Sequence, residues 1–229
     1  MKNILVVGGS SGIGHQLVKQ LTSENQVFAT FNTHSLDRSH NLTTFQYSAG
    51  EAFNTDLLPD VLDGVVYCPG AIKLKPFHRI TTTEFAEDFQ LQLMGAVSVL
   101  QAVMPKLKLA PQASVVLFST IAVQTGFPFH SLVASSKGAI EGFTRALAAE
   151  WAPKIRVNAI APSITDTPLA SGLLNTPEKR EANAQRHPLK TIGTSENIAD
   201  AVEFLLSEKS AWVTGQVLHV DGGLSALKL

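Results

Sequence analysis

A glycine-rich turn near the N-terminus has the spacing of an anion-binding site. Gly8, Gly12 and Gly14 form the pattern Gly-x-x-x-Gly-x-Gly between a short apolar run and a helix-like segment. Glycines let the backbone approach a pyrophosphate without intervening side chains, and the N-terminus of the next helix offers free N–H groups. A turn that merely joins a strand to a helix is the alternative. We expect the turn to bind a dinucleotide through Gly8, Ser10, Ser11, Gly12, Ile13 and Gly14.

The end of the second apolar run bears on which dinucleotide binds. A carboxylate there would bind the ribose 2′-hydroxyl of NAD and repel the 2′-phosphate of NADP. Phe31 lies near this position, and the first carboxylate after it is Asp37. The polar side chains that follow the run are those of Asn32, Thr33, His34, Ser35 and Arg38. We therefore expect NADP(H) to be favoured over NAD(H), the alternative being a polar turn with no role in cofactor choice.

Three further motifs, taken with the glycine turn, resemble those of a known family. Residues 155–162 read Ile-Arg-Val-Asn-Ala-Ile-Ala-Pro, residues 214–216 Thr-Gly-Gln, and residues 220–223 Val-Asp-Gly-Gly. Together they resemble the motifs of the short-chain dehydrogenase/reductase family over nearly the whole chain, although Val7 stands where a threonine is common. The resemblance implies a Rossmann fold, a nicotinamide cofactor, a small-molecule substrate and a homodimer or homotetramer.

The resemblance also assigns active-site positions. The family uses an asparagine, a serine, a tyrosine and a lysine, and Lys137 matches the lysine that holds the nicotinamide ribose. Thr120, next to Ser119, falls at the serine position, and Gln92 falls at the asparagine position. A threonine hydroxyl can make the same hydrogen bonds as serine.

Two loops match the family's cofactor-binding segments in part. Tyr67-Cys68-Pro69-Gly70 resembles an Asn-Asn-Ala-Gly segment, of which Gly70 is retained. The segment from Pro162 to Thr167 resembles a Pro-Gly loop over the nicotinamide, with Ser163 in place of the glycine. The resemblance implies contacts of Pro162, Thr165 and Thr167 with the cofactor.

The tyrosine of the family's pattern is missing. Val133 stands four residues before Lys137, where the tyrosine belongs, and Tyr47 and Tyr67 are the only tyrosines in the sequence. In the family this tyrosine gives a proton to the substrate's carbonyl oxygen, and valine has no proton to give. We therefore expect an atypical member of the family with a different proton donor.

His130 is the first candidate for that donor. It precedes Lys137 by seven residues, and enoyl reductases of the family place their tyrosine at this longer spacing. An imidazole can exchange protons near neutral pH. A loop histidine that faces solvent or caps the following helix is the alternative, and His187 is a second candidate.

These residues need alternating strands and helices to position them. Continuous apolar runs, typical of parallel strands covered on both faces, lie at 4–7, 27–31, 43–47, 65–68, 114–118, 155–160 and 216–220. Helical patterns lie at 13–22, 85–107, 134–151 and 198–207, and Thr81 and Glu84 can form a capping box before the second of them. The order predicts an α/β chain with a three-layer Rossmann fold and a doubly wound parallel sheet of about seven strands. We expect a single domain over 1–229, with a partly helical lid at about 163–191.

Composition and charge argue against several partners. The 229 residues carry a formal net charge of −1, which does not favour nucleic acid. No stretch approaches the roughly 18 apolar residues of a membrane span. Cys68 is the only cysteine, which fits a reducing compartment. We expect a cytoplasmic protein without nucleic acid, membrane or metal.

Three functions are compatible with these residues. The first is an NADP(H)-dependent oxidoreductase that transfers hydride to a small carbonyl compound or an activated C=C bond. The second is a non-catalytic NADP(H)-binding sensor or partner protein, because three of the four active-site positions differ from the family's pattern. The third is non-redox chemistry, such as dehydration or isomerisation, in the same cleft.

Overall fold

A parallel sheet of seven strands forms the centre of the computed structural model, which describes residues 1–37 and 39–228. The strand order is β3-β2-β1-β4-β5-β6-β9. The strands are β1 (Asn3–Val7), β2 (Gln26–Phe31), β3 (Leu42–Gln46), β4 (Gly64–Tyr67), β5 (Ala113–Phe118), β6 (Ile155–Pro162) and β9 (Val217–Val220). The predicted doubly wound sheet is confirmed, with each strand within two residues of its expected bounds at either end.

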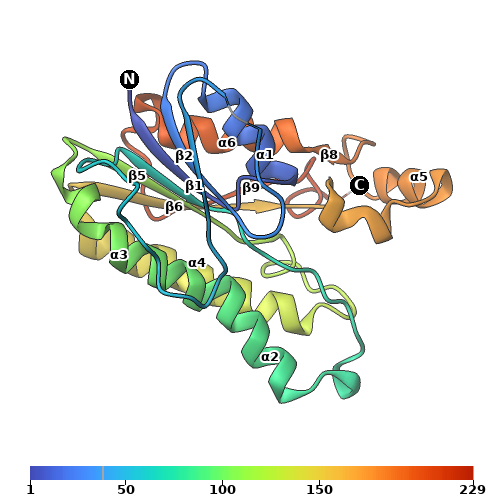
Figure 1. Ribbon diagram of the computed structural model, residues 1–229. Helices are drawn as coiled ribbons and strands as arrows, with labels where there is room; N and C mark the ends of the chain where they lie inside the picture. Colours follow the sequence, from blue (N-terminus) through green and yellow to red (C-terminus); the bar gives the residue numbers. More distant parts are fainter. Residues whose placement is uncertain (38, 229) are drawn as a thin grey trace.

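Helices cover both faces of the sheet and complete three layers (Figure 1). One face carries α1 (Gly12–Leu21) and α6 (Ser195–Leu206). The opposite face carries α2 (Thr82–Phe89), α3 (Gly95–Leu109) and α4 (Ser131–Trp151). Short 3-10 turns lie at Phe77–Arg79 (η1) and Glu208–Ser210 (η4). In the described part of the chain, none of the helices is long and apolar enough to cross a membrane.

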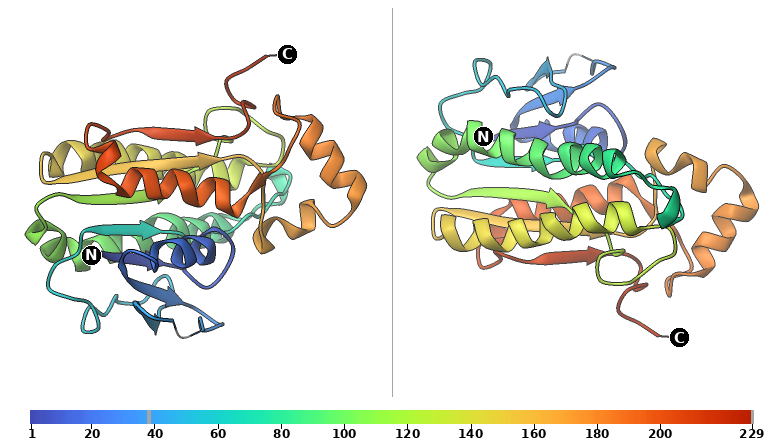
Figure 2. Two further views of the ribbon diagram at one scale, coloured as in Figure 1. Left: turned by 90° about the horizontal axis from the view of Figure 1, so that it is seen from above. Right: turned by 90° about the horizontal axis from the view of Figure 1, so that it is seen from below.

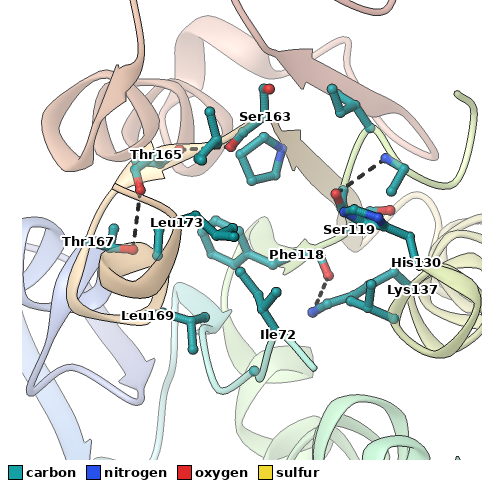
Figure 3. Close-up of a pocket in the computed structure, with 18 of the residues that line it drawn as sticks. Ile72, Phe118, Ser119, His130, Lys137, Ser163, Thr165, Thr167, Leu169 and Leu173 are labelled. Atoms are coloured by element: carbon teal, nitrogen blue, oxygen red, sulfur yellow. Dashed lines mark hydrogen bonds between the residues drawn. The ribbon is translucent and has the colours of Figure 1, made fainter. Parts of the chain in front are cut away.

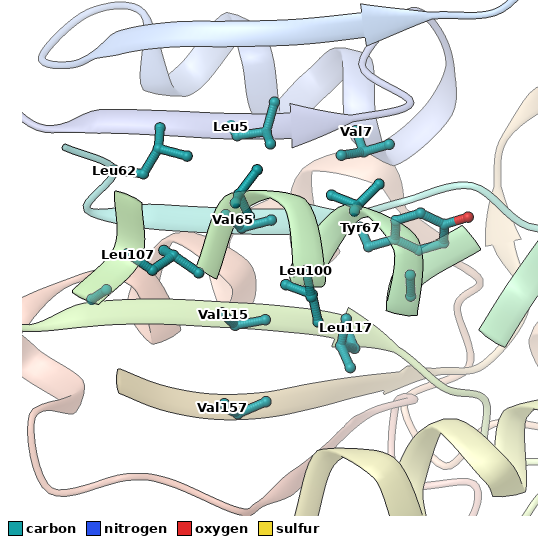
Figure 4. Close-up of a cluster of buried hydrophobic side chains, with 14 of the residues drawn as sticks. Leu5, Val7, Leu62, Val65, Tyr67, Leu100, Leu107, Val115, Leu117 and Val157 are labelled. Atoms are coloured by element: carbon teal, nitrogen blue, oxygen red, sulfur yellow. The ribbon is translucent and has the colours of Figure 1, made fainter. Parts of the chain in front are cut away.

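Side chains that alternate along the strands belong to two separate hydrophobic clusters, one on each face of the sheet. Leu5, Val65 and Val115 point toward α3, where they pack with Leu100 and Leu107 (Figure 4). Their neighbours along the strands face the α1 and α6 side, in a cluster that includes Ile4, Val6, Leu17, Val66 and Ile198. Because every central strand is covered on both faces, its sequence is a continuous apolar run.

The long helix expected at 85–107 is divided in two by a wider turn. The Thr81–Glu84 capping box starts α2 as predicted, but residues Gln90–Met94 form a π-helical turn (η2) before α3. The Tyr67 hydroxyl donates to the Leu91 carbonyl oxygen at 2.6 Å inside this turn. Such turns are rare and often mark functional sites, and this one contains Gln92, a predicted active-site residue.

The segment from 163 to 191 is partly helical, as its sequence indicates. It contains β7 (Thr165–Asp166), the 3-10 helix η3 (Pro168–Leu173) and α5 (Pro177–Gln185). The β7 strand pairs with β8 (Gly193–Thr194). In Figure 2 the segment extends beyond the edge of the sheet at which β6 ends. It therefore lies at the carboxyl ends of the parallel strands.

Candidate active site

The glycine turn follows β1, and its backbone conformation requires glycine at two positions. Gly8 and Gly12 have φ angles of 78° and 53°, which side chains disfavour. A Cβ on Gly14 would lie 2.2 Å from the Gly8 carbonyl oxygen. Thr30 at the end of β2 holds the turn, because its hydroxyl accepts from the Gly8 N–H at 3.0 Å and its carbonyl from the Gly9 N–H at 2.8 Å. This cradle without side chains, at the start of α1, fits a dinucleotide pyrophosphate.

A cavity of about 290 Å³ lies next to the turn, where β4, β5 and β6 end. The predicted site residues that line it are Ile13, Gly70, Gln92, Thr120, His130, Lys137, Pro162, Thr165 and Thr167. The predicted residues that do not line it are Gly8, Ser10, Ser11, Gly12, Gly14, Asn32, Thr33 and His34. The first group comes from segments far apart in sequence, so the fold brings together most of the predicted active-site positions.

Lys137 is buried in the wall of this cavity. Its ammonium group donates to the carbonyl oxygen of Phe118, the last residue of β5, at 2.9 Å (Figure 3). Burial lowers the pKa of Lys137 to about 8, although the nearby Asp88 and Cys68 act to raise it. The lysine is therefore fixed in direction and holds its proton less tightly than an exposed lysine.

Asp88 is a buried carboxylate that sequence reasoning missed. It is 3% exposed and accepts the Ser136 hydroxyl at 2.5 Å. Gln92 donates to it through Nε2 at 3.2 Å. The carboxylate thus ties the last turn of α2 to the residue before Lys137. A carboxylate one helical turn before Gln92 was the available signal, since residues at i and i+4 share a helix face.

Gln92 also has an acceptor that is not used within the chain. It is 1% exposed, and its Oε1 has no hydrogen-bond partner in the described part of the chain. A Cβ on Gly70 would lie 3.2 Å from Gln92 Oε1 and 3.7 Å from Lys137 Nζ, so the missing side chain at Gly70 leaves both groups room. A buried polar atom without a partner requires an explanation, and a bound water or ligand between these groups would supply one.

The two neighbouring hydroxyls after β5 have different surroundings. Ser119 donates to the Glu141 carboxylate on α4 at 2.8 Å. The Thr120 hydroxyl accepts only a 3.3 Å bond from the Ala122 N–H in the described part of the chain. Thr120 therefore has the freer hydroxyl, as its assignment to the serine position requires.

Val133 and His130 lie at the start of α4 and both line the cavity. The helix begins at Ser131, three residues earlier than expected, so His130 is its N-cap residue. The His130 side chain makes no capping bond. Its Nδ1 lies 2.8 Å from the Pro128 carbonyl oxygen and so must carry a proton. This leaves Nε2 available to the cavity.

The backbone before His130 is strained. Phe129 has a φ of 69°, a left-handed conformation that costs a bulky residue free energy. This conformation fixes the direction in which the chain enters α4. Figure 3 shows His130 and Lys137 on one side of the cavity, opposite Leu169 and Leu173.

Neither tyrosine lines the cavity. Tyr67 is bound to the π-helical turn, and burial raises its pKa far above the ordinary value. Tyr47 packs edge-on against Phe53 with ring centroids 4.9 Å apart. In the described part of the chain, the position four residues before Lys137 is therefore not filled by a tyrosine from elsewhere.

The loops expected to contact the cofactor differ in exposure. Asn32, Thr33 and His34 are exposed after β2, and Arg38 lies outside the described residues. Thr165 is buried, and its hydroxyl donates to the Ser163 carbonyl at 3.0 Å. A Cβ on Gly12 would lie 3.5 Å from the Thr167 side chain, so this loop faces the glycine turn.

His187, the second candidate donor, is bound within the segment 163–191. Its Nδ1 lies 2.8 Å from the Asn183 carbonyl oxygen, and its Nε2 lies 2.8 Å from the Ser163 hydroxyl. Both ring nitrogens are thus used within the chain. This arrangement joins the loop after β6 to the end of α5.

Comparisons with known proteins show a family to which the chain is similar over most of its length. Residues 51–225 match the family model described as enoyl-(acyl carrier protein) reductase. L-xylulose reductase of Bos taurus is 31% identical over 98% of this chain and 97% of its own length. A tropinone reductase homolog of Arabidopsis thaliana is 30% identical over 98% of this chain and 91% of its own length.

Solved structures show the same fold. A short chain dehydrogenase family protein of Francisella tularensis superposes with a TM-score of 0.90 at 26% identity, over 99% of this chain and all of the other. ElxO with NADP bound superposes with a TM-score of 0.86 at 25% identity, over 99% of both chains. The sheet order, the glycine turn and these similarities lead to one conclusion: the chain belongs to the short-chain dehydrogenase/reductase family of oxidoreductases.

Proposed function

We propose that this protein is an NADP(H)-dependent oxidoreductase that reduces a small carbonyl compound or an activated C=C bond with a proton donor other than tyrosine. The composition of the cavity wall is the main support for this proposal. It combines a buried, fixed Lys137 and the Thr120 hydroxyl with Val133 one helical turn before the lysine. When bound, the reduced nicotinamide would supply the hydride.

The chain's own residues would divide the remaining tasks. The glycine turn, Thr165, Thr167, Pro162 and Gly70 would hold the dinucleotide, and Lys137 would bind the nicotinamide ribose. Thr120 would donate a hydrogen bond to the substrate's oxygen, which stabilises negative charge as hydride reaches the carbon. Gln92 would hold a water between its free Oε1 and Lys137. The segment 163–191, with its apolar Leu169 and Leu173 at the cavity, would act as a lid.

His130 is the proposed proton donor. For a carbonyl substrate, hydride adds to the carbon while the oxygen takes the Nε2 proton of the His130 imidazolium, directly or through one water, which leaves the neutral ring protonated at Nδ1. For an activated C=C bond, hydride adds to the β-carbon, and the resulting enolate takes its proton from water. The second route needs no side-chain acid, so it is less sensitive to the missing tyrosine.

The residues after β2 support the proposed selectivity for NADP(H). Among the described residues from 32 to 37 the only carboxylate is Asp37, and Asn32, Thr33 and His34 are exposed there as possible 2′-phosphate ligands, with Arg38 following. ElxO, a structural relative, has been solved with NADP bound.

Titration with both cofactors and a turnover assay test the function. We expect NADPH to bind at least about 10-fold more tightly than NADH, the worth of one good phosphate contact. A panel of small aldehydes, ketones and enones should include substrates that consume NADPH, followed by loss of nicotinamide absorbance. Tight NADPH binding with no turnover across the panel would favour a binding protein, and tighter NADH binding would reverse the cofactor assignment.

We also propose a homodimer or homotetramer in the cytoplasm. Large apolar side chains are exposed on α6, on the edge strand β9 and between them, namely Phe204, Leu218 and Trp212. Exposed apolar groups of this kind mark contact surfaces when they are contiguous. Light scattering should give a mass of two or four chains, and Trp212→Glu should lower it; a single-chain mass for the unaltered protein would contradict the proposal.

A further inference from the structure

The cavity has a one-sided distribution of charge. Its basic lining residues are His130, Lys137, Arg186 and His187, and none of its described lining residues is an aspartate or a glutamate. The rest of the wall includes the apolar side chains of Ile72, Phe118, Leu169 and Leu173. A cavity of this composition favours a ligand that combines an apolar body with a negative charge.

Arg186 is the basic residue whose position the proposed function does not explain. It follows the last residue of α5, and its guanidinium carbon lies 5.3 Å from the centre of the Phe127 ring. The Phe127 ring lies 5.4 Å from that of His130. Stacking on an aromatic face fixes the direction of a guanidinium group, so Arg186 is held at the same wall as His130.

The guanidinium group of Arg186 has donors to spare. Its hydrogen bond in the described part of the chain is a long one, 3.4 Å to Asn183 Oδ1. It takes part in none of the ion pairs between described residues, whereas Arg180, within α5, pairs with Asp166. A guanidinium group has five N–H donors, so most of those of Arg186 remain available to a ligand.

We infer that the substrate carries a carboxylate group, which binds to Arg186. The reducible C=O or C=C bond then lies toward Thr120 and Lys137, and the apolar side chains contact the carbon chain between the two ends. Guanidinium and carboxylate form paired, charge-assisted hydrogen bonds that are stronger than neutral ones. The preferred substrates are therefore short oxo acids or unsaturated oxo acids, and this specificity rests on the proposed reductase function.

A series of oxo acids and their carboxamides tests the inference. The probes are 2-, 3-, 4- and 5-oxo acids with NADPH, each compared with its neutral amide. We expect the best acid to exceed its amide in kcat/KM by at least about 10-fold. Arg186→Gln should raise KM for that acid by about 10- to 100-fold, leave kcat within about 3-fold, and leave the amide unaffected.

An exposed lysine outside the lid segment provides the control. Lys154, just before β6, is exposed and does not line the cavity, so Lys154→Gln removes one positive charge without removing the carboxylate's partner. It should leave KM for the acid unchanged, and Arg186→Gln should leave the affinity for NADPH unchanged. An equal preference for acid and amide, or equal effects of the two variants, would overturn the inference.

Calorimetry separates this inference from the reductase proposal. We expect 4-oxopentanoate to bind the NADP⁺-loaded protein, and to bind Arg186→Gln at least about 10-fold more weakly. If the acid binds in this way but no probe is reduced, the carboxylate site stands and the reductase function fails. If the acid does not bind, or binds both proteins equally, the carboxylate site is wrong.

Discussion

Lys137→Met is expected to lower kcat/KM for NADPH oxidation by about 10³-fold, because one side chain supplies both orientation and charge. The Lys137 ammonium group is buried and bound to the end of β5, so in the proposed function it would meet a bound cofactor in one fixed geometry. Methionine fills a similar volume without donors or charge. Steady-state kinetics and NADPH titration measure the loss in catalysis and in affinity.

Folding of this variant needs its own check by thermal denaturation. Methionine removes the desolvation cost of a buried ammonium group, but it leaves the Phe118 carbonyl oxygen without its donor, and removing one member of a buried charged contact is destabilising when the other member stays buried. The matched control is Lys106→Met, because Lys106 also donates to a backbone carbonyl, that of Pro59 at 2.9 Å, but does not line the cavity. If both variants kept full activity, Lys137 would have no part in the reaction.

The pH dependence of the unaltered protein gives a second readout. Burial lowers the pKa of Lys137 to about 8 in the folded state from 10.5. Activity that needs the ammonium form should therefore fall as pH rises through about 8. In the same interval, up to about 10.5, the folded state binds fewer protons than the unfolded state, so the free energy of unfolding rises with pH relative to Lys137→Met. Denaturation of both proteins at pH 7.5 and 9.5 measures that difference, and parallel curves would contradict it.

Local patterns were sufficient to predict the scaffold. Parallel strands buried on both faces are continuous apolar runs, so the fold was predictable from short stretches. The glycine turn after the first run is equally local, and it predicts a dinucleotide site. Thr81 and Glu84 predicted the start of α2 for the same reason, since a capping box is complete within four residues.

Contacts across long stretches of sequence were not predictable in this way. The Asp88–Ser136 hydrogen bond joins residues 48 positions apart, and no periodicity indicates it. The π-helical turn contains a carbonyl bound by Tyr67, which comes from a strand 24 residues earlier. Arg186 looks like any surface arginine until the fold places it over Phe127. Each of these contacts joins segments that no local sequence pattern relates to one another.

Loss of the His130 imidazole is expected to lower kcat for ketone reduction by about 10²-fold, the lower range for removal of a general acid. His130→Ala removes the ring. His130→Asn keeps an N–H donor near the Nδ1 position for the Pro128 carbonyl but cannot exchange a proton near neutral pH. Both variants should lose the same activity, whereas His78→Ala, at an exposed histidine outside the cavity lining, should lose none.

The effect of His130→Ala should differ between ketone and enone substrates. Reduction of an activated C=C bond yields an enolate that water can protonate, so that reaction should change by less than about 3-fold in His130→Ala. Equal losses for ketones and enones would indicate that His130 positions the substrate rather than donating the proton. No loss for either would exclude His130 from the reaction.

A hydroxyl can be put back at the position of the missing tyrosine. Val133 lines the cavity one turn before Lys137, so Val133→Tyr puts a phenol where the family's pattern has one. In the His130→Ala background it should recover at least about 10-fold of the lost ketone reduction, while Val133→Phe, equal in bulk but without a hydroxyl, should recover none. Recovery by tyrosine alone would show that the cavity still accommodates a proton donor on α4. It would also show that the activity lost in His130→Ala is limited by the supply of a proton and not by the volume of the side chain at position 133. Recovery by both variants would mean that packing limits the reaction, and the proposed role of His130 would then be wrong.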